Sequence, residues 1–174
     1  DFVGRVYSYT RGDRVFSPQS HPDLFKGPTG ARDDLVIPQG WEIVNGADTG
    51  TYYAALVVAF SPDGDAFVID EFPNYRYVGG EAERDESITI PGWARGVYRR
   101  ILSLGGRATF WADPNSQFKA ELRNYGLNLI PQKMPVETRT EITREYFEHN
   151  RIYLAPWVVT LPYEIENAQW PEES

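Results

Sequence analysis

Residues 41–60 read WEIVNGADTGTYYAALVVAF, and this stretch decides the fold because two strand-forming runs flank a turn of small residues. The first run ends in GAD at residues 46–48, and the second covers residues 51–60, which are rich in strand-forming side chains. Residues 61–65 (SPDGD) then form a hairpin turn, in which proline presets φ and glycine supplies a positive φ. With a third strand at residues 66–72, the sequence predicts an antiparallel meander.

Downstream of a charged stretch at residues 79–86, which we predict to be mobile, the hydrophobic period becomes helical. Apolar residues recur every three or four positions after Pro91, and Gly105-Gly106 ends this helix. Further predicted elements are helices at residues 116–124 and 137–148, strands at residues 108–112, 127–130 and 152–154, and a last short helix from Pro162. This order predicts an α/β fold: a mixed sheet of three antiparallel strands followed by parallel strands, with helices on both faces.

The first part of the chain, residues 1–40, is dense in proline and glycine, which exclude long regular elements. We therefore predict an extended, turn-rich lead-in that packs on a domain formed by residues 41–174. Within the lead-in we expect one short strand pair, residues 5–9 with residues 14–16. Because the chain begins at Asp1 and lacks an initiator methionine, we expect it to be a piece of a longer polypeptide.

The overall composition excludes several classes of protein. The 174 residues suit one domain with a single sizeable core, and the absence of cysteine excludes disulfides and thiolate metal sites. The longest apolar run has nine residues (52–60), whereas a membrane helix needs about 20, so no membrane partner is expected. The net charge of −8, from 17 basic and 25 acidic residues, opposes nucleic-acid binding at long range.

Two aspartates end predicted central strands: Asp48 in GADTGT and Asp113 in WADPN. We predict that the strand ending at Asp113 lies beside, and parallel to, the strand ending at Asp48, about 4.8 Å away. Two carboxylates at one level repel each other unless a cation lies between them, and Mg²⁺ or Mn²⁺ prefers such oxygens. A pair of these ions about 3.5–4 Å apart can promote cleavage of a phosphodiester. The alternative is that each aspartate only caps a turn or a helix.

Three further residues are candidates for the same site. Glu71 ends a predicted strand and is a candidate metal ligand, the alternative being a sheet-edge charge or an ion-pair partner. Lys133 and Arg139 follow the Asp113 strand and are candidate contacts to DNA phosphates, although most basic side chains on helices are only solvated. With the net charge of −8, we expect DNA binding to be weak and local unless a partner adds positive surface.

Residues 41–170 resemble the C-terminal nuclease domain of the large terminase subunit of tailed bacteriophages, which has a ribonuclease H-like fold. The likeness rests on the order of several motifs, GADTG at 46–50, VIDE at 68–71, ADPN at 112–115 and LPYE at 161–164, and on a late tryptophan, Trp170. The separation of 65 residues between Asp48 and Asp113 also fits, with the charged stretch as an insertion. The resemblance implies that Asp48 and Asp113 are the catalytic, metal-binding acids.

The same resemblance implies a function: a two-metal-ion endonuclease, using Mg²⁺ or Mn²⁺, that cuts concatemeric double-stranded DNA during genome packaging. It implies double-stranded DNA, the terminase ATPase domain, the small terminase subunit and the portal as partners. The implied location is the host cytoplasm and, transiently, the portal of the viral procapsid.

The sequence departs from the family pattern in two ways. The family's third metal-binding Asp lies shortly beyond the region of Trp170, and no such residue precedes Ser174. Either the chain is truncated, or Glu164 or Glu166 substitutes, or the nuclease is crippled. In addition, the chain has no Gly-x-x-x-x-Gly-Lys-Ser/Thr loop, so DNA translocation is not expected of it.

Two other functions are compatible with this pattern. The missing third acid favours a non-catalytic module that docks in, or grips DNA for, a packaging motor, whereas the two aspartates favour the nuclease. A junction-resolvase-like nuclease is a further alternative, because a fold alone does not fix function.

Overall fold

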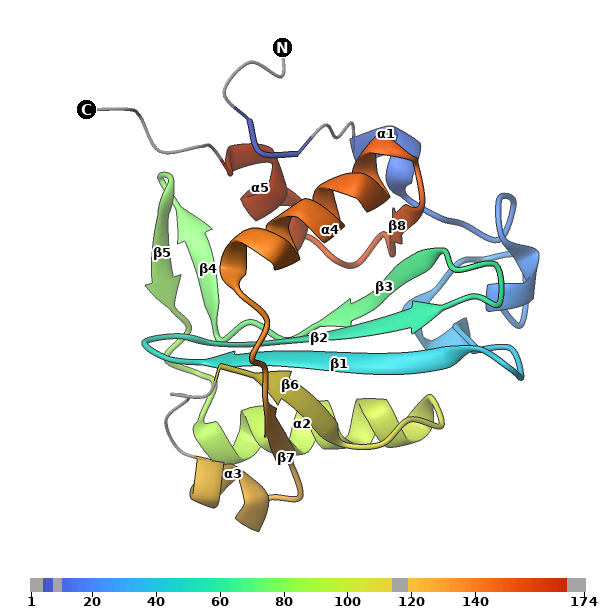
Figure 1. Ribbon diagram of the computed structural model, residues 1–174. Coiled ribbons are helices and arrows are strands. Elements are labelled where there is room, and N and C mark those ends of the chain that lie inside the picture. Colours follow the sequence, from blue (N-terminus) through green and yellow to red (C-terminus); the bar gives the residue numbers. More distant parts are fainter. Residues whose placement is uncertain (1–4, 8–10, 114–118, 169–174) are drawn as a thin grey trace.

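The computed structural model describes residues 5–7, 11–113 and 119–168, and its centre is the predicted antiparallel meander (Figure 1). The meander consists of β1 (Glu42–Thr49), β2 (Tyr53–Phe60) and β3 (Ala66–Glu71). The pairing of β1 with β2 is unbroken along both strands, while β2 and β3 shift register once, between Val57 and Val58. Alternate side chains of β2 are buried, as expected of a strand between two layers.

Three more strands extend the meander into a six-stranded sheet with the order β7-β6-β1-β2-β3-β8. β6 (Thr109–Ala112) lies parallel to β1, β7 (Asn128–Pro131) lies parallel to β6, and β8 (Ile152–Leu154) lies parallel to β3. The predicted mixed sheet, antiparallel in its first three strands and parallel thereafter, is confirmed.

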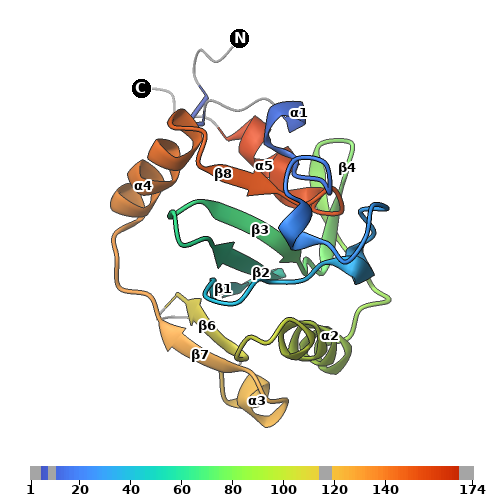
Figure 2. The same cartoon turned by 90° about the vertical axis from the view of Figure 1, so that its right-hand side faces the viewer.

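Helices cover both faces of this sheet, also as predicted. α2 (Ile90–Ser103) and α4 (Val136–Glu148) lie on opposite faces in Figure 2, while α3 (Lys119–Asn124) joins β6 to β7 and α5 (Thr160–Asn167) follows β8. Among the described residues, no helix is both long and apolar enough to cross a membrane.

The lead-in differs from the expected strand pair. Arg11–Arg14 forms a single helical turn, α1, and Val15 makes a parallel bridge to Leu154 of β8 instead of pairing with residues 5–7; residues 8–10 lie outside the described ranges. The physical reason is burial, because Phe16 is fully buried against Phe67 of β3. Two short 3₁₀ turns follow, Pro22–Leu24 and Arg32–Asp34.

The charged stretch predicted to be mobile is largely a strand. β4 (Tyr75–Val78) and β5 (Glu81–Arg84) form a hairpin around Gly79 and Gly80, whose φ values of 60° and 85° suit a two-residue turn. The hydroxyls of Tyr75 and Tyr77 both donate to the carboxylate of Glu164 on α5. Burial and the neighbouring Glu164 charge raise the pKa of Tyr77 to about 12.

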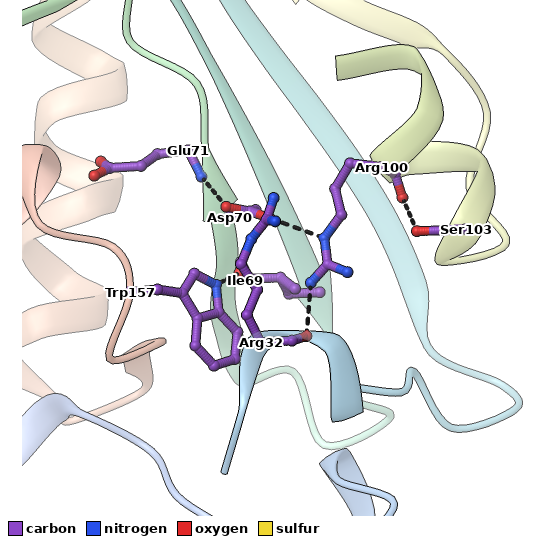
Figure 3. Close-up of polar contacts among 7 residues, drawn as sticks. All are labelled: Arg32, Ile69, Asp70, Glu71, Arg100, Ser103 and Trp157. Carbon is purple, nitrogen blue, oxygen red and sulfur yellow. Dashed lines mark hydrogen bonds and ion pairs between the residues drawn. The ribbon is translucent and has the colours of Figure 1, made fainter. Parts of the chain in front are cut away.

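A buried aspartate ties the lead-in and α2 to the sheet (Figure 3). The side chain of Asp70 on β3 is 4% exposed, and its Oδ2 accepts from Nε of Arg32 at 2.9 Å and Nε of Arg100 at 2.8 Å. Its Oδ1 accepts the backbone N–H of Glu71 at 3.0 Å. One carboxylate thus joins three segments that are distant in the sequence.

We predict that Asp70→Ala lowers the free energy of unfolding by about 3–5 kcal/mol, because it leaves the guanidinium of Arg100 buried without its anion. Urea unfolding followed by circular dichroism measures this change. Asp65→Ala is the matched control, since Asp65 and its partner Arg151 are both substantially exposed and such pairs contribute about 0–1 kcal/mol. Equal losses in the two variants would contradict the buried role of Asp70.

Candidate active site

Asp48 and Asp113 lie at the same level on two adjacent parallel strands. Ala47 of β1 is paired with Ala112 of β6, so the aspartate after each alanine emerges at the same edge of the sheet. This confirms the predicted pairing of the two strands. Both aspartates are exposed, and both line one cavity of about 720 Å³.

The register that aligns the two strands is fixed from inside the sheet. Asn45 of β1 is 4% exposed, and its Nδ2 donates to the backbone oxygens of Arg107 at 2.8 Å and Thr109 at 3.2 Å. These two bonds tie the beginning of β6 to the middle of β1. A slip of one residue would break them and would also turn Phe110, which is fully buried, to the other face.

Asp48 also has the turn-capping role that we considered as the alternative. Its Oδ1 accepts the backbone N–H of Gly50 at 3.2 Å, as an aspartate at the start of a turn commonly does. This bond uses one oxygen of a carboxylate that has two, and it orients the side chain at the cavity wall. Capping and metal binding are therefore compatible at Asp48.

The opposite wall of the cavity is one stripe of α4. Val136, Arg139, Thr140 and Thr143 have the spacing of a single helix face, and all four line the cavity. The Nε of Arg139 donates to the backbone oxygen of Met134 at 3.1 Å, and Arg139 lines the same cavity as the two carboxylates. The predicted DNA-binding residue Arg139 thus shares the cavity with Asp48 and Asp113.

Sequence reasoning missed three polar residues of this cavity: Tyr7, Thr140 and Thr143. Burial raises the pKa of the Tyr7 hydroxyl, while a hydrogen bond with Thr140 opposes the shift. The i, i+3, i+4 spacing of Val136, Arg139 and Thr140, continued by Thr143, is a signal that could have found the α4 stripe. Nothing in the sequence indicates that Tyr7 reaches this wall.

Glu71 lies apart from the two aspartates. Its carboxylate accepts the backbone N–H groups of Val159, Thr160 and Leu161, at 2.7, 2.7 and 2.9 Å. Figure 3 shows this carboxylate pointing away from its neighbour Asp70. These bonds satisfy the amides at the beginning of α5, a position at which the helix dipole also favours a negative charge.

The other predicted candidates also lie apart from the cavity. Glu164 accepts from two tyrosine hydroxyls, as described above, and is not among the residues that line the cavity. Lys133 is exposed two residues after the end of β7 and does not line it either. Trp170 and the motif residues Pro114 and Asn115 lie outside the described residues.

The donor set of the cavity fits a hard divalent cation. Two carboxylates at one level, open to water, suit Mg²⁺, which is bound through one or two carboxylates and keeps several waters, and also suit Mn²⁺. Within residues 5–7, 11–113 and 119–168, no cluster of three or more acidic or histidine side chains could hold a metal. Asp48 and Asp113 are the two candidate metal ligands that the described residues bring to this cavity.

Comparison with solved structures places the chain in one fold group. The P22 large terminase nuclease domain superimposes with a TM-score of 0.64 and 12% identity, covering 94% of this chain and 78% of that one. The large terminase of a thermophilic bacteriophage, in complex with ADP, gives a TM-score of 0.64 and 15% identity. That match covers 97% of this chain but 38% of the thermophilic phage protein.

No protein-family model and no curated protein matches the sequence. The chain has the fold of the large terminase nuclease domain, and the predicted resemblance is confirmed at that level. At 12–15% identity this likeness concerns the fold alone.

We predict that Glu71→Gln lowers the free energy of unfolding by about 0.5–2 kcal/mol, as loss of a helix cap does, because the glutamine side chain lacks the charge that faces the amides of α5. The same variant should bind Mn²⁺ as the unaltered chain does. Urea unfolding and Mn²⁺ titration measure the two properties, with Glu81→Gln on the exposed hairpin as the control. Lost Mn²⁺ binding at unchanged stability would restore Glu71 as a ligand.

Proposed function

We propose that this chain is the metal-dependent endonuclease domain of a viral DNA-packaging terminase and hydrolyses phosphodiester bonds of concatemeric double-stranded DNA. One observation carries the proposal: Asp48 and Asp113, 65 residues apart in the sequence, follow paired residues of adjacent parallel strands and line one cavity. The fold shared with the P22 nuclease domain supports it. The ATPase domain, the small terminase subunit and the portal are proposed as partners on the same ground.

In this proposal the chain's own residues bind and orient the substrate. Asp48 and Asp113 hold Mg²⁺ or Mn²⁺, which supplies positive charge to the phosphoryl oxygens and lowers the pKa of water when bound. The guanidinium of Arg139 contacts a phosphate oxygen from the opposite wall, and the bond to Met134 limits its rotation. The rigid sheet positions both carboxylates before DNA arrives.

A second candidate function is a non-catalytic module that docks in the motor or grips DNA. It is favoured by the absence of a third acid near Asp48 and Asp113 among the described residues. Metal binding separates the two candidates, because a docking module has no reason to bind Mn²⁺ through these carboxylates.

We predict that the unaltered chain nicks or linearises plasmid DNA with Mn²⁺, and that Asp48→Asn and Asp113→Asn each reduce cleavage to the level of a reaction without protein. Each change removes the charge of one metal ligand and keeps its volume. Agarose gel electrophoresis measures cleavage, and calorimetry with Mn²⁺ measures binding. Asp65→Asn is the control outside the cavity. Cleavage that is equal in all four proteins would reject the assignment.

We further predict that Arg139→Ala reduces the slope of log affinity against log salt by about 0.9 on duplex DNA, the change expected for one lost phosphate contact. Fluorescence anisotropy at several salt concentrations measures this slope. Arg95→Ala is the matched control, because Arg95 is an exposed arginine on α2, on the other face of the sheet. Lys133→Ala tests the remaining predicted contact. A slope that Arg139→Ala leaves unchanged would exclude Arg139 from the DNA interface.

A further inference from the structure

One large aromatic side chain near the cavity is left outside the core. Along β6, Phe110 and Ala112 are 0% and 2% exposed, whereas Trp111 between them is 47% exposed. Trp111 is paired with Gly46 of β1 and, because side chains alternate along a strand, points to the same face as Asp48, two residues after Gly46. The indole therefore lies on the open face of the sheet, on the side of the candidate metal ligands.

The fold leaves room around this indole. Trp111 is paired with Gly46 of β1 on one side and with Ile130 of β7 on the other. Gly46 has no side chain, so β1 presents none directly opposite the ring. In Figure 2, α4 covers the other half of this face, and none of the drawn helices lies over the β6–β7 part of it. With 47% of its surface open to solvent, the Trp111 side chain keeps part of its ring free to contact a ligand.

The distance from Trp111 to Asp113 fits the spacing of nucleotides. Two residues along a strand span about 6.6 Å, and successive nucleotides in a stacked strand are about 3.4 Å apart. If a phosphate of a DNA strand lies at Asp48 and Asp113, the base one or two nucleotides away along that strand lies at the distance of the indole. Two exposed cations follow or precede these strands in the sequence: Arg107 comes shortly before β6 and Lys133 shortly after β7.

We propose that Trp111 stacks on an unpaired base of the DNA strand, next to the phosphate held at Asp48 and Asp113. This inference rests on the proposed nuclease function and specifies its substrate: DNA that is locally unpaired at the cleavage position. In a continuous duplex both faces of a base are covered by its neighbours, whereas an unpaired base offers a free face to an aromatic ring.

Charge supports an aromatic contact over a purely ionic one. The chain carries a net charge of −8, which weakens binding through many phosphates, whereas stacking on an indole requires no positive surface. The surroundings also disfavour a protein partner at this place. Protein interfaces have an apolar centre depleted of charge, but the strands beside Trp111 carry the exposed carboxylates of Asp48, Asp113 and Glu42.

The test uses a single-stranded oligonucleotide containing 2-aminopurine, whose fluorescence is quenched when the base stacks. Titration in EDTA measures stacking and affinity without cleavage. We expect quenching by the unaltered chain and by Trp111→Phe, and its loss with Trp111→Ala together with an affinity about 5- to 160-fold lower. Leu102→Ala is the control, since Leu102 on α2 is 50% exposed on the other face. Equal quenching by Trp111→Ala, or none by the unaltered chain, would overturn the inference.

A second measurement separates this inference from the proposed function. With Mn²⁺, the unaltered chain should cut a duplex with a short bubble faster than a fully paired duplex, and Trp111→Ala should abolish this preference. Equal cleavage of both duplexes by the unaltered chain would reject the role of Trp111 and leave the nuclease in place. Base quenching without any Mn²⁺-dependent cleavage would reject the nuclease and leave the stacking surface in place.

Discussion

The parallel pairing of β1 with β6 is the constraint on which the candidate site depends. Ala47 opposite Ala112 sets the level of both aspartates, and the buried amide of Asn45 holds that register through two backbone oxygens. Because side chains alternate in a strand, a shift of one residue would place the two carboxylates on opposite faces. The chemistry proposed for the cavity therefore depends on hydrogen bonds that lie beneath it.

Asp70 and Glu71, the two adjacent acids at the end of β3, make polar contacts that stabilise the fold. Asp70 joins the lead-in and α2 to β3, and Glu71 satisfies the first amides of α5. The two side chains thus point in different directions: Asp70 contacts α2 and the lead-in, and Glu71 contacts α5. This division leaves Asp48 and Asp113 as the acids that line the cavity.

The sequence was sufficient to predict the elements whose signal is local. The apolar run of β2, the proline–glycine turn after it and the period of α2 all produced the expected structure, and connection rules predicted the mixed sheet with β6 beside β1. Contacts between distant segments were harder to predict. Val15 pairs with Leu154 of β8 because the next residue, Phe16, is buried against Phe67 of β3. The charged stretch formed β5 because two tyrosines of the same hairpin donate to Glu164. The carboxylate of Glu71 accepts from amides at the beginning of α5, a helix that starts 89 residues later in the sequence.

The long interval between the two aspartates has a consequence during synthesis. β1 leaves the ribosome well before β6, with β2, β3, the hairpin and α2 in between. Until β6 emerges and docks, Asp48 is at this edge without Asp113, so the two carboxylates cannot yet lie at one level. Under the proposed function, cleavage would therefore require a chain that has been synthesised beyond residue 113 and whose sheet has closed.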